Sequence, residues 1–131
     1  MPVAKQLSIF LENKPGVLAR LCQSFSDAGI NIEGMSVSDT VDHAVVRLIT
    51  SNPSGASAML ESAGVLVVET DVLTLTLPDK PGQLAEIART LSKAKVNIEY
   101  AYGTTEASGG MLVLRVSDIK KAMKVLKSKA K

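Results

Sequence analysis

Two short stretches of this 131-residue chain combine residue types that suit a small anionic ligand at the start of a helix. Asn13-Lys14-Pro15-Gly16-Val17-Leu18 recurs as Asp79-Lys80-Pro81-Gly82-Gln83-Leu84. Proline restricts the backbone and suits a helix start, while glycine lets a ligand approach the backbone closely. The first N–H groups of the following helix lack partners within it and attract a carboxylate. The same residues are also typical of a plain turn with a helix cap, so two interpretations stay open.

A second asparagine follows each stretch at the same distance. Asn31 comes eighteen residues after Asn13, and Asn97 comes eighteen residues after Asp79. Asparagine is unfavourable in strands, so its presence at the beginning of a strand pattern in both places needs a reason. It shapes the turn between helix and strand, or its amide donates to and accepts from a polar group of a ligand.

These coincidences are part of an internal repeat. Lys14-Pro15-Gly16 recurs as Lys80-Pro81-Gly82, and Asn31-Ile32-Glu33 recurs as Asn97-Ile98-Glu99. The spacing from Lys14 to Lys80 equals the spacing from Asn31 to Asn97, and this common spacing is called the repeat offset below. In the middle of the two copies, Arg47 is best matched to Arg115, which lies two residues beyond the position that the repeat offset gives. This match predicts that one hairpin loop is two residues longer. The duplication covers nearly the whole chain and predicts two domains, residues 1–69 and 70–131.

Each copy has the same order of predicted elements, β-α-β-β-α-β. Alternating apolar residues predict strands, and apolar residues three and four apart predict helices. In the first copy, we expect strands at 7–11, 30–38, 44–50 and 65–68, with helices at 17–28 and from 53 to about 63. In the second copy, we expect strands at 72–77, 97–103 and 111–116, with helices at 83–94 and from 119 to about 129.

This order predicts an α+β fold made of two ferredoxin-like units in tandem. We expect their antiparallel sheets side by side, with the helices on one face. The second unit lacks its last strand in this sequence, so residues 72–77 are expected to form a bare, uncharged sheet edge. Such an edge is most simply covered by a second copy of the chain in a homodimer, and the rival is that residues 127–131 fold back over it.

Composition excludes several classes of function. The formal net charge is only +2 and aromatic residues make up 3%, which argues against a nucleic-acid partner. One cysteine and one histidine exclude an intrachain disulfide and Cys-based or two-His metal sites. No apolar run is long enough for a signal peptide or a membrane span, so we expect a cytoplasmic protein. No nucleophile–base pair or phosphate loop is present, so we expect neither an enzyme nor a cofactor, and Cys22 is expected in the core.

Together the repeated motifs resemble the ACT domain. Asn-Lys-Pro-Gly-Val-Leu-Ala followed by Gly-Ile-Asn-Ile, and Asp-Lys-Pro-Gly-Gln-Leu-Ala followed by Val-Asn-Ile, are similar to that small regulatory module of amino-acid biosynthetic enzymes. The resemblance spans residues 3–128, and the chain looks like a tandem ACT protein without an attached catalytic domain. One departure is that Lys95-Val96 stands where the first copy has Gly29-Ile30, which predicts a different shape for that helix end.

The resemblance implies an allosteric, non-catalytic module that binds an amino acid between ACT units. The implied site joins the strand–helix loop of one unit to the second strand of its neighbour. One such site would use Asn13, Pro15, Gly16, Val17 and Leu18 with Asn97 and Ile98. The mirror site would use Asp79, Pro81, Gly82, Gln83 and Leu84 with Asn31 and Ile32. The alternative is a structural or regulatory subunit of an amino-acid biosynthetic enzyme that binds no ligand itself.

Overall fold

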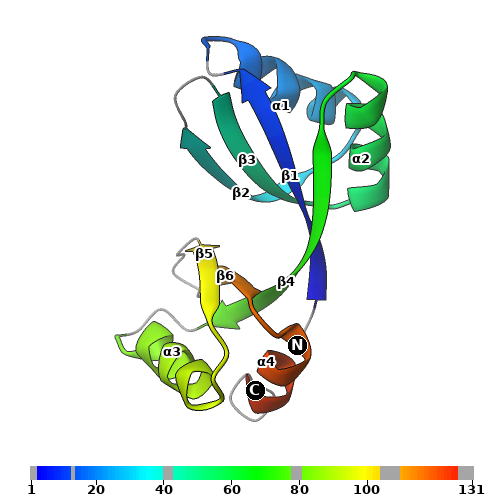
Figure 1. The fold of residues 1–131 in the computed structure, drawn as a ribbon. Coiled ribbons are helices and arrows are strands. Elements are labelled where there is room, and N and C mark those ends of the chain that lie inside the picture. The colour runs from blue at the N-terminus through cyan, green and yellow to red at the C-terminus, as the bar shows by residue number, and fades with distance from the viewer. Residues whose placement is uncertain (1–2, 13, 40–42, 78–80, 104–109, 127–131) are drawn as a thin grey trace. The chain divides into compact units, whose positions relative to one another are not determined.

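The computed structural model describes residues 3–12, 14–39, 43–77, 81–103 and 110–126. The first copy forms β1 (Val3–Glu12), α1 (Val17–Asp27), β2 (Ile32–Asp39), β3 (His43–Thr50), α2 (Pro53–Ser62) and β4 (Val67–Leu77). The second copy shares β4 and adds α3 (Gln83–Lys93), β5 (Ile98–Gly103), β6 (Gly110–Val116) and α4 (Ile119–Leu126) (Figure 1). The α+β class is confirmed, and so is the order of elements, except that the two strands expected at 65–68 and 72–77 are one continuous strand, β4. No strand follows α4 within the described residues.

The chain divides into two compact units. The first unit is residues 5–70, and the second unit is residues 71–131 together with residues 1–4. The boundary therefore passes through two continuous strands, between Ala4 and Lys5 in β1 and between Thr70 and Asp71 in β4. The beginning of β1 belongs to the unit formed by the second copy.

The strand order of each unit is that of a ferredoxin-like sheet. The order is β2-β3-β1-β4 in the first unit and β1-β4-β6-β5 in the second, and the pairs of β3 with β1 and β2 and of β6 with β4 and β5 are antiparallel. The prediction that β4 would lack a neighbour on one side is wrong, because β4 lies between β6 and β1. The beginning of β1 stands where the second copy has no last strand of its own.

The register of the two copies is the same throughout their paired strands. Leu7 lies opposite Leu48 as Leu73 lies opposite Leu114, and the repeat offset relates both members of one pair to those of the other. The predicted equivalence of Arg47 with Arg115 is therefore wrong. Arg47 lies opposite Ser8 on β1, whereas Arg115 on β6 lies opposite Tyr100. The two arginines match in residue type only. A shift of two residues along a strand leaves each side chain on the same face of the sheet, so the alternating pattern does not reveal the wrong match.

Both helices of each unit cover one face of its sheet. In the first unit, alternate residues of β1 are buried against residues from α1 and α2, the cluster being Leu7, Ile9, Leu11, Leu21, Phe25, Ile30, Val46, Leu48, Ala56 and Leu60. In the second unit, residues of β4 and β6 are buried against α3 and α4, the cluster being Leu73, Leu75, Ile87, Leu91, Val96, Leu114, Val116, Ala122 and Leu126. Burial of apolar area on one face is the main stabilising term of each unit.

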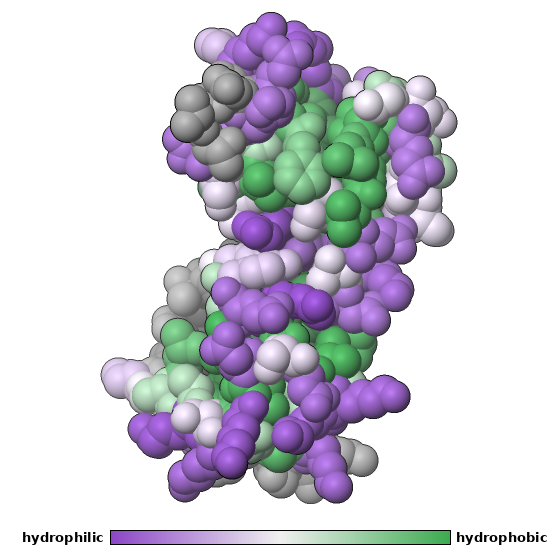
Figure 2. All heavy atoms as spheres, viewed as in Figure 1, coloured by the Kyte–Doolittle hydropathy of each residue, from purple (hydrophilic) through white to green (hydrophobic). Residues whose placement is uncertain are grey.

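The opposite face of the first unit's sheet carries exposed apolar residues. Successive residues of a strand point to opposite faces, so Phe10 and Val68 lie opposite the helices. Phe10 is 41% exposed and Val68 is 46% exposed. Figure 2 shows apolar residues gathered over the first unit in this view. None of the described helices has the length and apolar character that crossing a bilayer requires.

The two phenylalanines of the chain provide a matched test of this core. Phe25 is fully buried and Phe10 is 41% exposed. We expect Phe25→Ala to lower the free energy of unfolding by about 3–5 kcal/mol. Phe10→Ala is expected to lower it by less than about 1.5 kcal/mol, because it removes less buried area. Urea denaturation followed by circular dichroism measures both, and equal losses would contradict the assignment of the core.

Candidate functional site

The predicted turn before each first helix is present in the described residues. Gly16 and Gly82 are the N-cap residues of α1 and α3, with φ of 87° and 90°. A side chain is strained in this left-handed conformation, so glycine is required by the backbone itself. Neither N-cap supplies a side-chain hydrogen bond to the helix. In α1, Val17 N–H donates to Lys14 O at 3.4 Å, so the N–H groups of Leu18 and Ala19 keep the donor capacity that a carboxylate would use.

The turn of the first copy carries an ion pair. Lys14 Nζ lies 2.8 Å from Glu12 Oε2, and both side chains are mainly exposed. This hydrogen bond and charge lower the pKa of the Glu12 carboxyl, with smaller contributions from His43 and Arg20. Pro15, Gly16, Pro81 and Gly82 are all exposed, while Asn13 and Asp79 lie outside the described residues.

The second group of predicted residues lies at the other end of the first helices. Asn31 precedes β2, and its backbone N–H donates to Ser51 Oγ at 2.9 Å, while Ser51 N–H donates to Asn31 O at 2.9 Å. Asn97 and Ser117 repeat both bonds at the same distances before β5. No hydrogen bond from either asparagine side chain to another described residue is found, and both asparagines are exposed. The backbone shapes the turn and leaves the amide available, so the two sequence interpretations are compatible.

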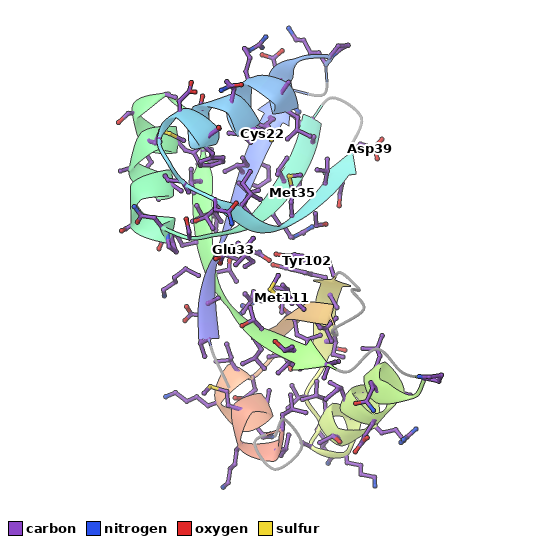
Figure 3. The ribbon with its side chains drawn as sticks, turned by 180° about the vertical axis from the view of Figure 1, so that it is seen from behind. Cys22, Glu33, Met35, Asp39, Tyr102 and Met111 are labelled. Carbon is purple, nitrogen blue, oxygen red and sulfur yellow. The ribbon has the colours of Figure 1, made fainter. Side chains whose placement is uncertain are left out.

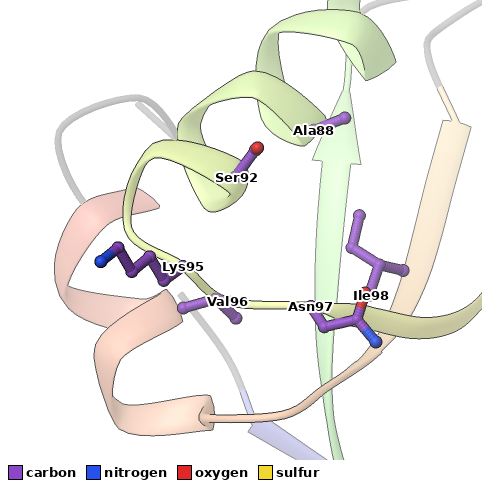
Figure 4. A pocket seen from close by; sticks show the side chains of 6 residues that line it. All are labelled: Ala88, Ser92, Lys95, Val96, Asn97 and Ile98. Carbon is purple, nitrogen blue, oxygen red and sulfur yellow. The ribbon is translucent and has the colours of Figure 1, made fainter.

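A hollow opens beside each of these asparagines. The first has a volume of about 390 Å³ and is lined by Cys22, Phe25, Ser26, Gly29, Ile30, Asn31 and Ile32. The second has a volume of about 380 Å³ and is lined by Ala88, Ser92, Lys95, Val96, Asn97 and Ile98 (Figure 4). The repeat offset relates every residue of the second hollow to a residue of the first, so the fold builds the same hollow twice.

Several lining residues were not predicted from the sequence. Ser26 and Ser92 place a hydroxyl beside Asn31 and Asn97, and their recurrence at the repeat offset was the available signal. Cys22 is half-buried and lines the first hollow instead of lying wholly in the core, and Figure 3 shows it on α1. No described group of acidic, histidine or cysteine residues could hold a metal ion.

The predicted site residues fall into two halves that one unit cannot join. The turn at Pro15 and Gly16 precedes α1, whereas Asn31 and Ile32 follow it. An eleven-residue helix is about 16 Å long. The same separation holds in the second unit, where Pro81, Gly82, Gln83 and Leu84 begin α3 and Asn97 and Ile98 follow it. Val17 and Leu18 accordingly lie with the turn, at the first positions of α1.

The ends of α1 and α3 have the same shape, contrary to the sequence expectation. Gly29 has φ of 71° and Lys95 has φ of 60°, and Lys95 is the one non-glycine residue with positive φ in the described part of the chain. Ile30 N–H donates to Phe25 O at 2.9 Å, and Val96 N–H donates to Leu91 O at the same distance. Lysine thus adopts the glycine conformation, which is strained for a residue with a Cβ.

The chain matches the family model described as an ACT domain pair over residues 1–130. Two ferredoxin-like units with repeated helix-end hollows define a tandem regulatory-domain fold, and the chain belongs to the ACT domain family. It is 28% identical over 109 residues to the acetolactate synthase isozyme 3 small subunit of Escherichia coli K12, covering 83% of this chain and 64% of that protein. The chain therefore spans less than two thirds of the length of this relative.

Solved structures have the same fold. A Bacteroides thetaiotaomicron protein superposes with a TM-score of 0.92 at 37% identity, covering 97% of this chain and 88% of the other. The ligand-free regulatory subunit of aspartate kinase from Thermus thermophilus superposes with a TM-score of 0.68 at 12% identity, covering 98% and 97%. The second likeness shows the fold alone.

The strained lysine allows a test on stability. We expect Lys95→Gly to raise the free energy of unfolding by about 1 kcal/mol, because glycine adopts positive φ without a steric penalty. The reverse change, Gly29→Lys, is expected to lower it by a similar amount. Thermal and chemical denaturation of both variants measures these differences. A destabilised Lys95→Gly protein would show that the lysine side chain contributes more than its backbone strain removes.

The ion pair in the first turn makes a second test. Lys14→Ala is expected to raise the pKa of Glu12 towards its ordinary value, because the hydrogen bond and the positive charge are removed. A lowered pKa stabilises the folded chain above the ordinary pKa of the carboxyl, and this contribution is lost as the pH falls through the lowered pKa. NMR titration of the Glu12 carboxyl measures the shift. Lys93→Ala, at an exposed position on α3, should leave the pKa of Glu12 unchanged.

Proposed function

We propose that this chain is a non-catalytic, cytoplasmic regulatory module that binds a small amino acid at an interface between ACT units. The observation that carries the proposal is the repetition of one polar hollow beside Asn31 and Asn97. In both copies, the backbone of the asparagine is bound by a serine while its side-chain amide stays available. A structural role alone would not require the available amide in both copies.

The turns and the hollows complement each other when two units meet. Gly16 and Gly82 precede helix starts, and the N–H groups after the first one in each helix suit the carboxylate of an amino acid. Asn31 and Asn97 offer an amide oxygen that accepts from an ammonium group. One half therefore recognises the anionic group of the ligand and the other half recognises its cationic group.

Antiparallel pairing of outer strands would bring these halves together. Within the first unit, the beginning of β2 lies opposite the end of β3, and the end of β2 lies on the side where β1 ends and the turn to α1 begins. β2 and β5 are the outermost strands of their units. If two such strands pair antiparallel, the hollow of one unit lies next to the turn of the other.

We propose the two composite sites on this basis. One combines Asn13, Pro15, Gly16, Val17 and Leu18 with Asn97 and Ile98, and the other combines Asp79, Pro81, Gly82, Gln83 and Leu84 with Asn31 and Ile32. Because β2 and β5 are at opposite ends of the strand order within one chain, a homodimer through the outer strands would supply the second unit. Because lysine replaces glycine beside Asn97, the two kinds of site are expected to differ in affinity.

The chain is homologous to a regulatory subunit of an amino-acid biosynthetic enzyme. The curated relative is the small subunit of acetolactate synthase, and one structural neighbour is a regulatory subunit of aspartate kinase. We propose that this chain likewise acts on a metabolic enzyme and changes its activity when the amino acid binds. The alternative is a subunit that assembles with such an enzyme and binds no ligand.

Isothermal titration calorimetry with the twenty amino acids tests the proposal. We expect at least one of them to bind. Gly16→Val and Gly82→Val are each expected to weaken binding at the site they form at least tenfold, about 1.4 kcal/mol, because the branched side chain blocks the approach of the carboxylate. Both changes also introduce backbone strain, since both glycines have positive φ.

Gly64→Val is the matched control. Gly64 has φ of 78° at the end of α2, where an added Cβ meets nothing within 4 Å. Gly64→Val therefore introduces the same kind of backbone strain away from the proposed sites and should leave the affinity for the amino acid unchanged. Binding that survives both Gly16→Val and Gly82→Val would place the ligand elsewhere, and no binding of any amino acid would favour the ligand-free subunit.

A further inference from the structure

A third hollow lies between α1 and α2 of the first unit, away from both asparagines. Its volume is about 250 Å³. Its apolar lining residues come from β1, from both helices and from the segment after α2, namely Leu11, Val17, Leu21, Met59, Leu60 and Val65. Three of these are only partly buried against the core cluster, so apolar surface remains accessible at this place.

The only charged side chain that lines this hollow is Arg20. Its Nη1 atom lies 3.5 Å from the position that a Cβ on Gly16 would occupy, so the guanidinium lies over the beginning of α1. The other polar lining side chain is Ser24, whose hydroxyl donates to Arg20 O at 3.0 Å. The Arg20 guanidinium is therefore the remaining side-chain donor of the lining, and no carboxylate is among the lining residues.

We infer that this hollow binds a small aliphatic carboxylate that carries no amino group. The apolar walls take the hydrocarbon part, and Arg20 forms a charge-assisted hydrogen bond with the carboxylate. The volume of about 250 Å³ has room for a short aliphatic chain such as that of hexanoate. An α-ammonium group held beside the Arg20 guanidinium would be repelled by it, so an acid without an amino group should bind more tightly than an amino acid.

The second copy carries the opposite charge at the equivalent place. At the repeat offset, Glu86 corresponds to Arg20 and Gln83 corresponds to Val17. The binding of a carboxylate is therefore a property of the first copy, and it goes beyond the amino-acid binding proposed above for both copies.

Calorimetry and methyl NMR with hexanoate on the full chain test this inference. Hexanoate should bind and shift the methyl signals of Leu21 and Met59. Hexanamide lacks the charge and norleucine adds an ammonium group, so both should bind at least tenfold more weakly. Decanoate should bind no more tightly than hexanoate, because the hollow holds no longer chain.

Two variants separate the charge from the volume. Arg20→Gln keeps much of the side chain and removes the charge, so hexanoate should bind about tenfold more weakly. Ala63→Leu adds three carbon atoms at the edge of the hollow and should weaken hexanoate binding by a similar factor. Arg89→Gln, on the exposed surface of α3, is the control and should leave binding unchanged.

The inference is wrong if millimolar hexanoate shifts neither methyl signal, or if neither Arg20→Gln nor Ala63→Leu weakens hexanoate binding relative to the unchanged chain. The twenty amino acids, measured on the same variants, report separately on the proposed function. Amino-acid binding at the site that uses Gly82 and Asn31 should not compete with hexanoate, because none of the residues of that site lines this hollow. Competition at that site would assign both ligands to one place and overturn the inference.

Discussion

The first helix of each unit has to lie along the apolar face of its sheet, and the arrangement of the candidate sites depends on this constraint. α1 buries Leu21 and Phe25 against β1 and β3, so its beginning lies at one end of the unit and its end lies about 16 Å away. The ligand-recognising residues before and after the helix are therefore separated within one unit. The proposed binding at an interface rests on this packing, because a second unit would have to supply the missing half.

Duplication preserved the backbone more strictly than the side chains. The strand register, the serine bonds at Asn31 and Asn97, and the helix-end hydrogen bonds are the same in both copies. Backbone hydrogen bonds tolerate few geometries, whereas exposed side chains beside a hollow change with little effect on stability. Lys95 in place of Gly29, and Glu86 in place of Arg20, therefore give two similar units different ligand chemistry.

Two continuous strands join the copies, in place of a separate linker. β1 and β4 each cross from one compact unit to the other without a break. The beginning of β1 belongs to the second unit, which has no strand after α4 among the described residues. The second unit thus uses chain from the first copy, and β4 has a neighbour on both of its sides.

Local patterns in the sequence determined most of the elements, the duplication and the two core faces, and they are the basis on which both half-sites are proposed. They did so because helix and strand periodicity, glycine at helix ends and the repeat offset are properties of neighbouring residues. Tertiary structure alone decided the conformation of Lys95, the register of Arg47, the neighbour of β4 and the hollow beside Arg20. These depend on contacts between segments far apart in the chain, where packing of the whole unit outweighs the preference of any one residue.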